Sequence, residues 1–244
     1  MLFRSVPPGL RAALAVDAFR RTAAYDARIA AELPARMSAA GLDLPDEPGL
    51  PGASDPYPER LTVAFEKVET LRYGENPHQA AARYRRLGPG VVDGPFSSGE
   101  APLQGKALSY NNVLDASAAD ALARSLRGPG CVIVKHTNPC GVAERRTLLA
   151  AWQAALEADP VSAFGGVVAL NREVDGPVAE ALSALFLEVV VAPAFAPEAR
   201  RILAAKANLR LIVDEGLAVE SGAGQAAPDP TGSIRTAEIG RAHV

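Results

Sequence analysis

The sequence CVIVKHTNPCGV (residues 131–142) begins as a short apolar strand and ends in charge and a turn. Its first four residues are apolar and lead directly into Lys135 and His136, after which Asn138 and Pro139 interrupt the pattern. In an open parallel α/β sheet, ligands bind outside the carboxyl ends of the strands. The stretch therefore predicts a strand that presents a cation and an imidazole at such an end, followed by a turn at Asn138-Pro139 toward a helix.

The same kind of strand recurs along the chain and alternates with helical segments. We expect strands at 131–135, 166–170, 187–192 and 209–213, and helices at 114–128, 145–158, 177–186 and 197–207. Apolar strands separated by helices favour a mainly parallel sheet with helices on its faces. The pattern therefore predicts an α/β fold.

The flanking segments have a different composition. Residues 9–33 are rich in alanine with helical periodicity, and we expect one helix ending before Pro34. Residues 34–60 carry six prolines and three glycines and are predicted to be a linker. We expect domain boundaries that separate 1–33, 34–60, a globular unit at 61–215, and a loose, truncated tail at 216–244.

The two ends of the chain carry unusual short segments. LFRS at the start and IGRAHV at the end resemble translated sequencing-adapter DNA, since ATCGGAAGAGCACACGTC encodes the latter. We therefore expect the first and last residues to be artefacts of a fragmented assembly.

Bulk composition excludes several classes of function. The chain is 48% hydrophobic and 22% charged, and 25 basic against 28 acidic residues leave a formal charge of −3. No strongly basic face for nucleic acid is indicated. The apolar runs are too short to span a bilayer, and two cysteines make no disulfide framework. We expect a soluble, cytoplasmic protein with no nucleic-acid or membrane partner.

The pair Lys135-His136 suits acyl-type transfer. A neutral imidazole can accept a proton near neutral pH, and an ammonium can stabilise a developing oxyanion. Two other interpretations stay open on the residues alone. The pair can be two solvent-exposed polar residues that end a strand and have no further role. Alternatively, His136 can join Cys131 and Cys140 as a zinc ligand, although no CxxC pair is present.

Three further polar motifs surround this pair in the sequence. LRYGENPHQ (71–79) places Arg72 and Tyr73 in a polar segment around Gly74 and Pro77, which is either a plain surface turn or a binding segment, since arginine recognises phosphate through a two-pronged guanidinium. LQGKALSYNNVLDA (103–116) contains Asn112, in a position where Ser or Asn can also be a helix N-cap. DPVSAFGG (159–166) is expected to be a loop that is either functional or a plain turn.

Together these motifs carry a family resemblance. LRYGENPHQAA, LQGKALSYNNVLDA, CVIVKHTNPCGVA and DPVSAFGGVVALNREVD occur in this order, and over roughly residues 9–236 the chain resembles the bifunctional purine biosynthesis enzymes. Those enzymes combine AICAR formyltransferase with IMP cyclohydrolase. The resemblance implies that residues 1–33 close the cyclohydrolase domain, with Arg21 where histidine is usual. It implies that 61–215 form the first formyltransferase subdomain, a cytidine deaminase-like three-layer α/β/α unit without metal.

The resemblance also implies a reaction and its residues. A formyl group moves from the cosubstrate 10-formyltetrahydrofolate to the 5-amino group of AICAR, and the parent enzyme then cyclises the product FAICAR to IMP. By motif, His136 resembles the general base and Lys135 its oxyanion-stabilising partner. Arg72 resembles a phosphate ligand, Tyr73 a residue near the ring, and Asn112 a contact of the base.

The family pattern extends beyond this chain. The second formyltransferase subdomain and most of the cyclohydrolase domain have no counterpart here, and family members are homodimers. We therefore expect negligible formyl transfer from the isolated chain. The alternatives are a non-catalytic module that binds AICAR or another nucleotide, and a zinc deaminase-like enzyme.

Overall fold

The computed structural model describes residues 6–42, 64–87, 94–96 and 101–218. By its contacts, the chain divides into two compact units, Met1–Lys67 with Tyr84–Val91, and Val68–Arg83 with Val92–Val244. The expected boundary at residue 60, the adapter-like ends and most of the expected tail lie outside the described residues. They stay predictions.

The first unit contains the long helix α1 (Pro8–Ala39), which does not end before Pro34 as predicted. Proline removes one backbone hydrogen bond but need not end a helix that is well supported on both sides. Glu32 pairs with Arg28 at 2.8 Å, before the proline, and with Arg36 at 2.7 Å, across it, although exposed pairs of this kind add little to helix stability. Arg21 pairs with Asp17 in the same i, i+4 manner.

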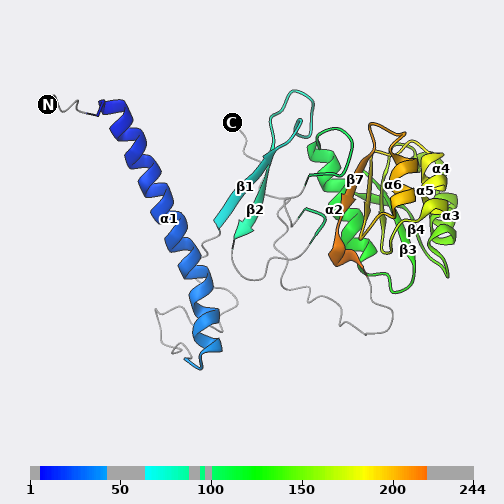
Figure 1. The fold of residues 1–244 in the computed structure, drawn as a ribbon, viewed down its shortest axis with the longest axis horizontal. Coiled ribbons are helices and arrows are strands. Elements are labelled where there is room, and N and C mark those ends of the chain that lie inside the picture. The colour runs from blue at the N-terminus through cyan, green and yellow to red at the C-terminus, as the bar shows by residue number, and fades with distance from the viewer. Residues whose placement is uncertain (1–5, 43–63, 88–93, 97–100, 219–244) are drawn as a thin grey trace. The chain divides into compact units, whose positions relative to one another are not determined.

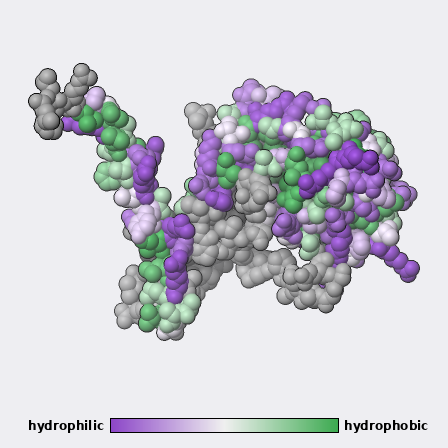
Figure 2. Space-filling view, viewed as in Figure 1, coloured by the Kyte–Doolittle hydropathy of each residue, from purple (hydrophilic) through white to green (hydrophobic). Residues whose placement is uncertain are grey.

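Helix α1 exposes several large apolar side chains, including Leu10, Leu14 and Phe19. Figure 2 shows hydrophobic patches in green next to hydrophilic ones in purple along this helix. No helix in the described part of the chain is both long and apolar enough to cross a membrane.

The second unit is built on a five-stranded sheet that is mixed, and the prediction of a mainly parallel sheet was wrong. Its strand order is β4 (Asn138–Glu144), β3 (Gly130–Lys135), β5 (Val167–Leu170), β6 (Val189–Ala192) and β7 (Arg210–Val213). Strands β5, β6 and β7 are parallel, but β3 is antiparallel to both of its neighbours.

The error came from β4, which the sequence led us to treat as a turn at Asn138-Pro139. Pro139 is tolerated because β4 lies at the sheet edge, where a missing N–H costs little. The ladder register also shifts beside it, between Ile133 and Val134. Strand β4 reverses the chain, and the helical crossover that follows keeps the direction of β4 rather than of β3. Strand β5 therefore runs against β3.

Helices cover both faces of this sheet, which gives three layers (Figure 1). The side chains of Cys131 and Ile133 belong to one core, with residues of α3 (Leu148–Ala158), α5 (Gly176–Ser183) and α6 (Pro197–Leu203). Those of Val132 and Val134 belong to the other core, with residues of α2 (Tyr110–Ala123). The period-two alternation of strand side chains thus divides the core between the faces.

The remaining described elements are short. Strands β1 (Ala64–Thr70) and β2 (Ala82–Leu87) form a separate two-stranded sheet, α4 spans Pro160–Ala163, and the 3-10 helix η1 spans Glu215–Leu217. Helix α2 begins four residues earlier than the predicted start at 114, because Ser109 caps it. The Ser109 hydroxyl accepts from the Asn112 amide, and the Asn112 side chain accepts from the Ser109 amide.

Candidate functional site

The predicted site residues lie at the edge of the sheet where β5, β6 and β7 begin. Val134, at the end of β3, faces Val167 at the start of β5, and Val189 faces Arg210 at the start of β7. The expectation that Lys135 and His136 lie at the carboxyl ends of parallel strands is therefore wrong. Their own strand ends there, but the parallel strands start there.

His136 and Thr137 form the two-residue turn between β3 and β4. Lys135 pairs with Asn138 across it, and both central residues have left-handed backbones, with φ of 54° at His136 and 62° at Thr137. Two positive φ angles are what a type I′ hairpin turn requires, a position usually given to Asn-Gly. A left-handed backbone costs roughly 1–2 kcal/mol per non-glycine residue, and β-branched threonine is poorly suited to it.

Asp115 of α2 stabilises this strained turn. Its carboxylate accepts hydrogen bonds from the backbone N–H of Thr137 at 2.7 Å and of His136 at 3.3 Å. Hydrogen bonds to a charged group contribute at most about 1.5–3 kcal/mol each, and the 3.3 Å bond contributes less than the 2.7 Å bond, so the two together offset part of the strain. The carbonyl of His136 in turn accepts from the side chains of Thr137 and Asn138. The His136 side chain is exposed above this anchored backbone.

Lys135 connects the turn to the next loop. Its Nζ donates to the carbonyl oxygen of Phe164 at 2.8 Å, and it is half-buried. The ring of Phe164 packs against that of Phe186, with centroids 5.3 Å apart. An ammonium has three donors, so two remain for another partner.

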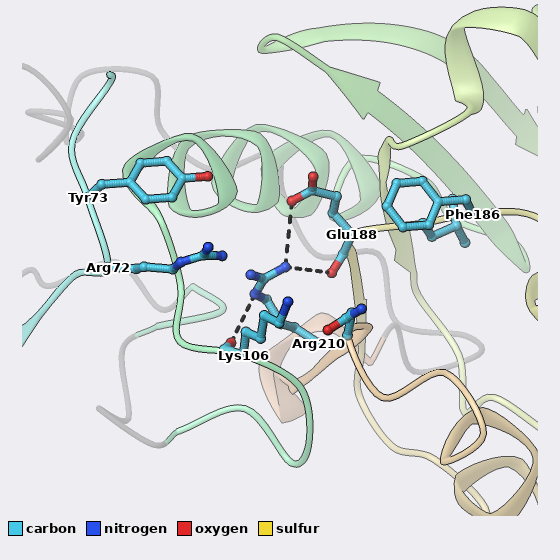
Figure 3. Close-up of a pocket in the computed structure, with 8 residues that line it drawn as sticks. Arg72, Tyr73, Lys106, Phe186, Glu188 and Arg210 are labelled. Carbon is cyan, nitrogen blue, oxygen red and sulfur yellow. Dashed lines mark hydrogen bonds and ion pairs between the residues drawn. The ribbon is translucent and has the colours of Figure 1, made fainter. Parts of the chain in front are cut away.

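Phe186 also lines a pocket of about 160 Å³ at the same edge of the sheet (Figure 3). The residues that line it come from four segments and are Arg72, Tyr73, Lys106, Phe186, Leu187, Glu188, Asn208 and Arg210. The Arg72 guanidinium lies 5.3 Å from the centroid of the Tyr73 ring. A cation held against an aromatic face is a common way to orient an arginine for an anionic ligand.

The pocket is electropositive, with three cationic side chains against the one carboxylate of Glu188. Arg210 is only 6% exposed and lies 3.5 Å from the Glu188 carboxylate. Burial lowers the pKa of Arg210, Glu188 opposes that change, and the nearby Arg72 cation lowers the pKa further. Two guanidinium groups that repel each other across a pocket favour an anion between them.

Backbone hydrogen bonds hold the walls of this pocket together. The Arg72 amide donates to the carbonyl of Leu108, and the Tyr110 amide donates to that of Tyr73. The Arg210 side chain donates to the carbonyls of Lys106 and Ala107. The motifs LRYG (71–74) and LQGKALSY (103–110), which are distant in sequence, thus form one wall.

Asn112 lies behind the pocket wall rather than on its surface. Its side chain is buried, closes the capping box of α2, and donates to the Glu188 carboxylate at 2.7 Å. Asn112 and Asp115 are one turn apart on α2, so this helix contacts both the pocket wall and the His136 turn. A contact between Asn112 and the base of a ligand stays a prediction.

The structure thus places Arg72 and Tyr73 in one pocket, whereas Lys135 at the end of β3 and His136 in the turn after it do not line that pocket. Sequence reasoning missed Asp115, Glu188 and Arg210. Arg210 had a usable signal, since an arginine leads the otherwise apolar strand RLIV. Within the part of the chain that the structure describes, no group of three or more His, Cys, Asp or Glu side chains is placed to hold a metal ion. The zinc alternative therefore gains no geometric support.

Comparison with known proteins gives a consistent result. The family described as "AICARFT/IMPCHase bienzyme" matches residues 4–226. The "Bifunctional purine biosynthesis protein PurH" of Polynucleobacter necessarius is 49% identical over 205 residues, 82% of this chain and 37% of that protein. Its namesake from Bacillus subtilis is 47% identical over 208 residues, 85% of this chain and 37% of that protein. The chain thus spans little more than a third of the length of these relatives.

Among solved structures, a form of RibD from Acinetobacter baumannii has a TM-score of 0.34 and 24% sequence identity, covering 43% of this chain and 36% of that chain. A second form gives a TM-score of 0.32 at the same identity. Similarity at this level carries no argument about the site.

Proposed function

The chain belongs to the AICARFT/IMPCHase bienzyme family, and we propose that the end of its sheet where β5, β6 and β7 begin binds AICAR. The same end of the sheet presents the general base for formyl transfer to AICAR. One observation carries this proposal. A cationic pocket and the Lys135-His136 turn lie at the same edge, and a single helix contacts both, through Asn112 to Glu188 and through Asp115 to the turn.

In the proposed reaction, the 5-amino nitrogen of AICAR attacks the formyl carbon of 10-formyltetrahydrofolate. His136 removes the proton from that nitrogen, and Lys135 stabilises the oxyanion with the N–H groups that Phe164 does not use. The bond from the formyl carbon to N10 of the folate then breaks, and N10 receives the proton that His136 took from the amine, which gives FAICAR and tetrahydrofolate. Arg72 binds the phosphate of AICAR, and Tyr73 lies beside the ring of AICAR. Asn112 contacts the nucleobase of AICAR either directly or through Glu188.

The wider proposal concerns the parent protein. We infer a cytidine deaminase-like formyltransferase subdomain after the end of a cyclohydrolase domain, in a cytoplasmic homodimer that also converts FAICAR to IMP. The layered sheet and the two free cysteines are compatible with this, and the family match supports it. Because this chain spans only about 37% of the length of these relatives, we expect its formyltransferase activity to be negligible by itself. Turnover similar to that of a full-length relative, with AICAR and the folate donor, would contradict this.

Calorimetric titration of the chain with AICAR tests the pocket. Arg72→Ala should weaken binding about 10- to 100-fold, because it removes a charge-assisted contact worth about 1.5–3 kcal/mol. The matched control is Arg127→Ala, which removes the same side chain from an exposed position just before β3, at the opposite edge of the sheet. This control should bind AICAR as the unmodified chain does.

A second variant separates catalysis from binding. His136→Ala should change AICAR affinity by less than about threefold, since a general base acts on the transfer step rather than on ground-state binding. If the chain fails to bind AICAR, or if Arg72→Ala and Arg127→Ala weaken binding equally, the proposed pocket is wrong. If His136 is also dispensable for transfer in a full-length enzyme, a non-catalytic nucleotide-binding module is the better description.

A further inference from the structure

The turn that carries His136 depends on a residue outside it. Both central residues are left-handed, neither is glycine or asparagine, and one is β-branched. Such a turn persists only where surrounding groups determine its conformation. Its N–H groups at His136 and Thr137 both point to one carboxylate, that of Asp115.

Asp115 is held in place more firmly than the turn itself. It lies in the second turn of α2, a helix that begins with a closed capping box and packs Ala116 and Ala119 fully buried against the sheet. The carboxylate is therefore a fixed acceptor on a rigid element, whereas the turn is an exposed hairpin end. Each of its oxygens binds a different amide, Oδ1 that of Thr137 and Oδ2 that of His136.

We propose that Asp115 is a positioning residue for formyl transfer. By accepting both amides, it fixes the left-handed backbone of His136 and Thr137, and this backbone decides the direction in which the Cβ and the imidazole of His136 leave the strand. Asn112, one turn earlier on the same helix, donates a hydrogen bond to the pocket residue Glu188. Helix α2 therefore sets the position of His136, the proposed general base, relative to the pocket. This role rests on the proposed function, because it matters for catalysis only if His136 is the base.

Nuclear magnetic resonance on the whole chain tests the inference. In Asp115→Ala, the backbone amides of His136 and Thr137 should exchange with solvent at least about tenfold faster, because both lose a charge-assisted bond. Their HN–Hα couplings and Cα shifts should lose the left-handed signature. The amides of Ile133 and Val134, within β3, should keep their exchange rates.

Asp115→Asn is the conservative variant. It keeps one carbonyl oxygen and exchanges the other acceptor for a donor, so one amide of the turn should stay protected while the other is released. Ser117→Ala, at an exposed position of the same helix, is the matched control and should change neither amide. The buried Trp152 reports in every variant whether the fold is intact.

The outcomes distinguish this inference from the proposed function. If folded Asp115→Ala keeps slow exchange and left-handed couplings at His136 and Thr137, the positioning role is overturned. If Asp115→Ala does not fold, equal protection of both amides in Asp115→Asn overturns it. AICAR binding is measured separately, and its failure with an altered turn would remove the proposed function while leaving Asp115 as the determinant of the turn.

Discussion

Replacing Asp120 with asparagine should remove a pH dependence from the stability of this chain. Asp120 lies on α2 and is 2% exposed. Its Oδ2 accepts from Arg124 at 2.8 Å, but its Oδ1 has no hydrogen-bond partner among the described residues. Burial raises the pKa of Asp120 to about 7, Arg124 opposes this, and the nearby Asp214 adds to it. The folded state thus favours the protonated carboxyl.

The direction and size of the effect follow from that pKa. Between an ordinary value of 3.8 and about 7, the folded chain holds a proton that the unfolded chain has released. The free energy of unfolding therefore falls as pH rises through this window and levels off above it. The difference of about 3 pH units, at about 1.4 kcal/mol each, sets an upper limit of about 4 kcal/mol.

Urea unfolding between pH 4 and pH 8 measures this contribution. Trp152 is the only tryptophan and is 1% exposed, so its fluorescence reports global unfolding. Asp120→Asn cannot ionise, and its stability relative to the unmodified chain should rise with pH, by up to about 4 kcal/mol. Ser117→Ala, on the same helix, should keep the pH dependence of the unmodified chain. If the stability of Asp120→Asn relative to the unmodified chain stays constant or falls as pH rises, Asp120 does not cause this pH dependence.

Three further predictions concern packing, helix capping and thiols. Gly141→Ala should destabilise the fold by more than about 1 kcal/mol, because the new Cβ would collide with the backbone carbonyl of Ala155; thermal unfolding followed by circular dichroism measures this, and an unchanged midpoint would contradict it. Ser109→Ala should cost about 1 kcal/mol by removing the N-cap of α2, as urea titration can show; a stability equal to that of the unmodified chain would argue against the cap. Iodoacetamide should alkylate the half-buried Cys140 on the order of 100-fold faster than the buried Cys131. Burial raises the pKa of both thiols, but only Cys131 needs the fold to open before the reagent can reach it. Mass spectrometry measures the two rates, and equal rates in the folded chain would contradict this prediction.

Most of the local elements and the family are predictable from the amino-acid sequence alone. Apolar strands at 131–135, 166–170, 187–192 and 209–213 correspond to β3, β5, β6 and β7, because a buried strand needs a continuous apolar run that is visible in sequence. The four polar motifs identified the purine biosynthesis family, and the match over residues 4–226 confirms it. Motifs are readable because they are contiguous.

How these elements combine depends on contacts that form in the folded protein. Strand β4 was missed because proline is typical of turns and is tolerated only in edge strands. Whether a strand lies at the edge of a sheet is not visible in the sequence around Pro139. Because of this strand, β3 runs antiparallel to β5. Lys135 and His136 therefore lie at the end of the sheet where β5, β6 and β7 begin. The roles of Asp115, Glu188 and Arg210 depend on contacts between residues distant in sequence, such as Arg210 with Lys106. No local pattern encodes such contacts, because they exist only once the sheet has assembled.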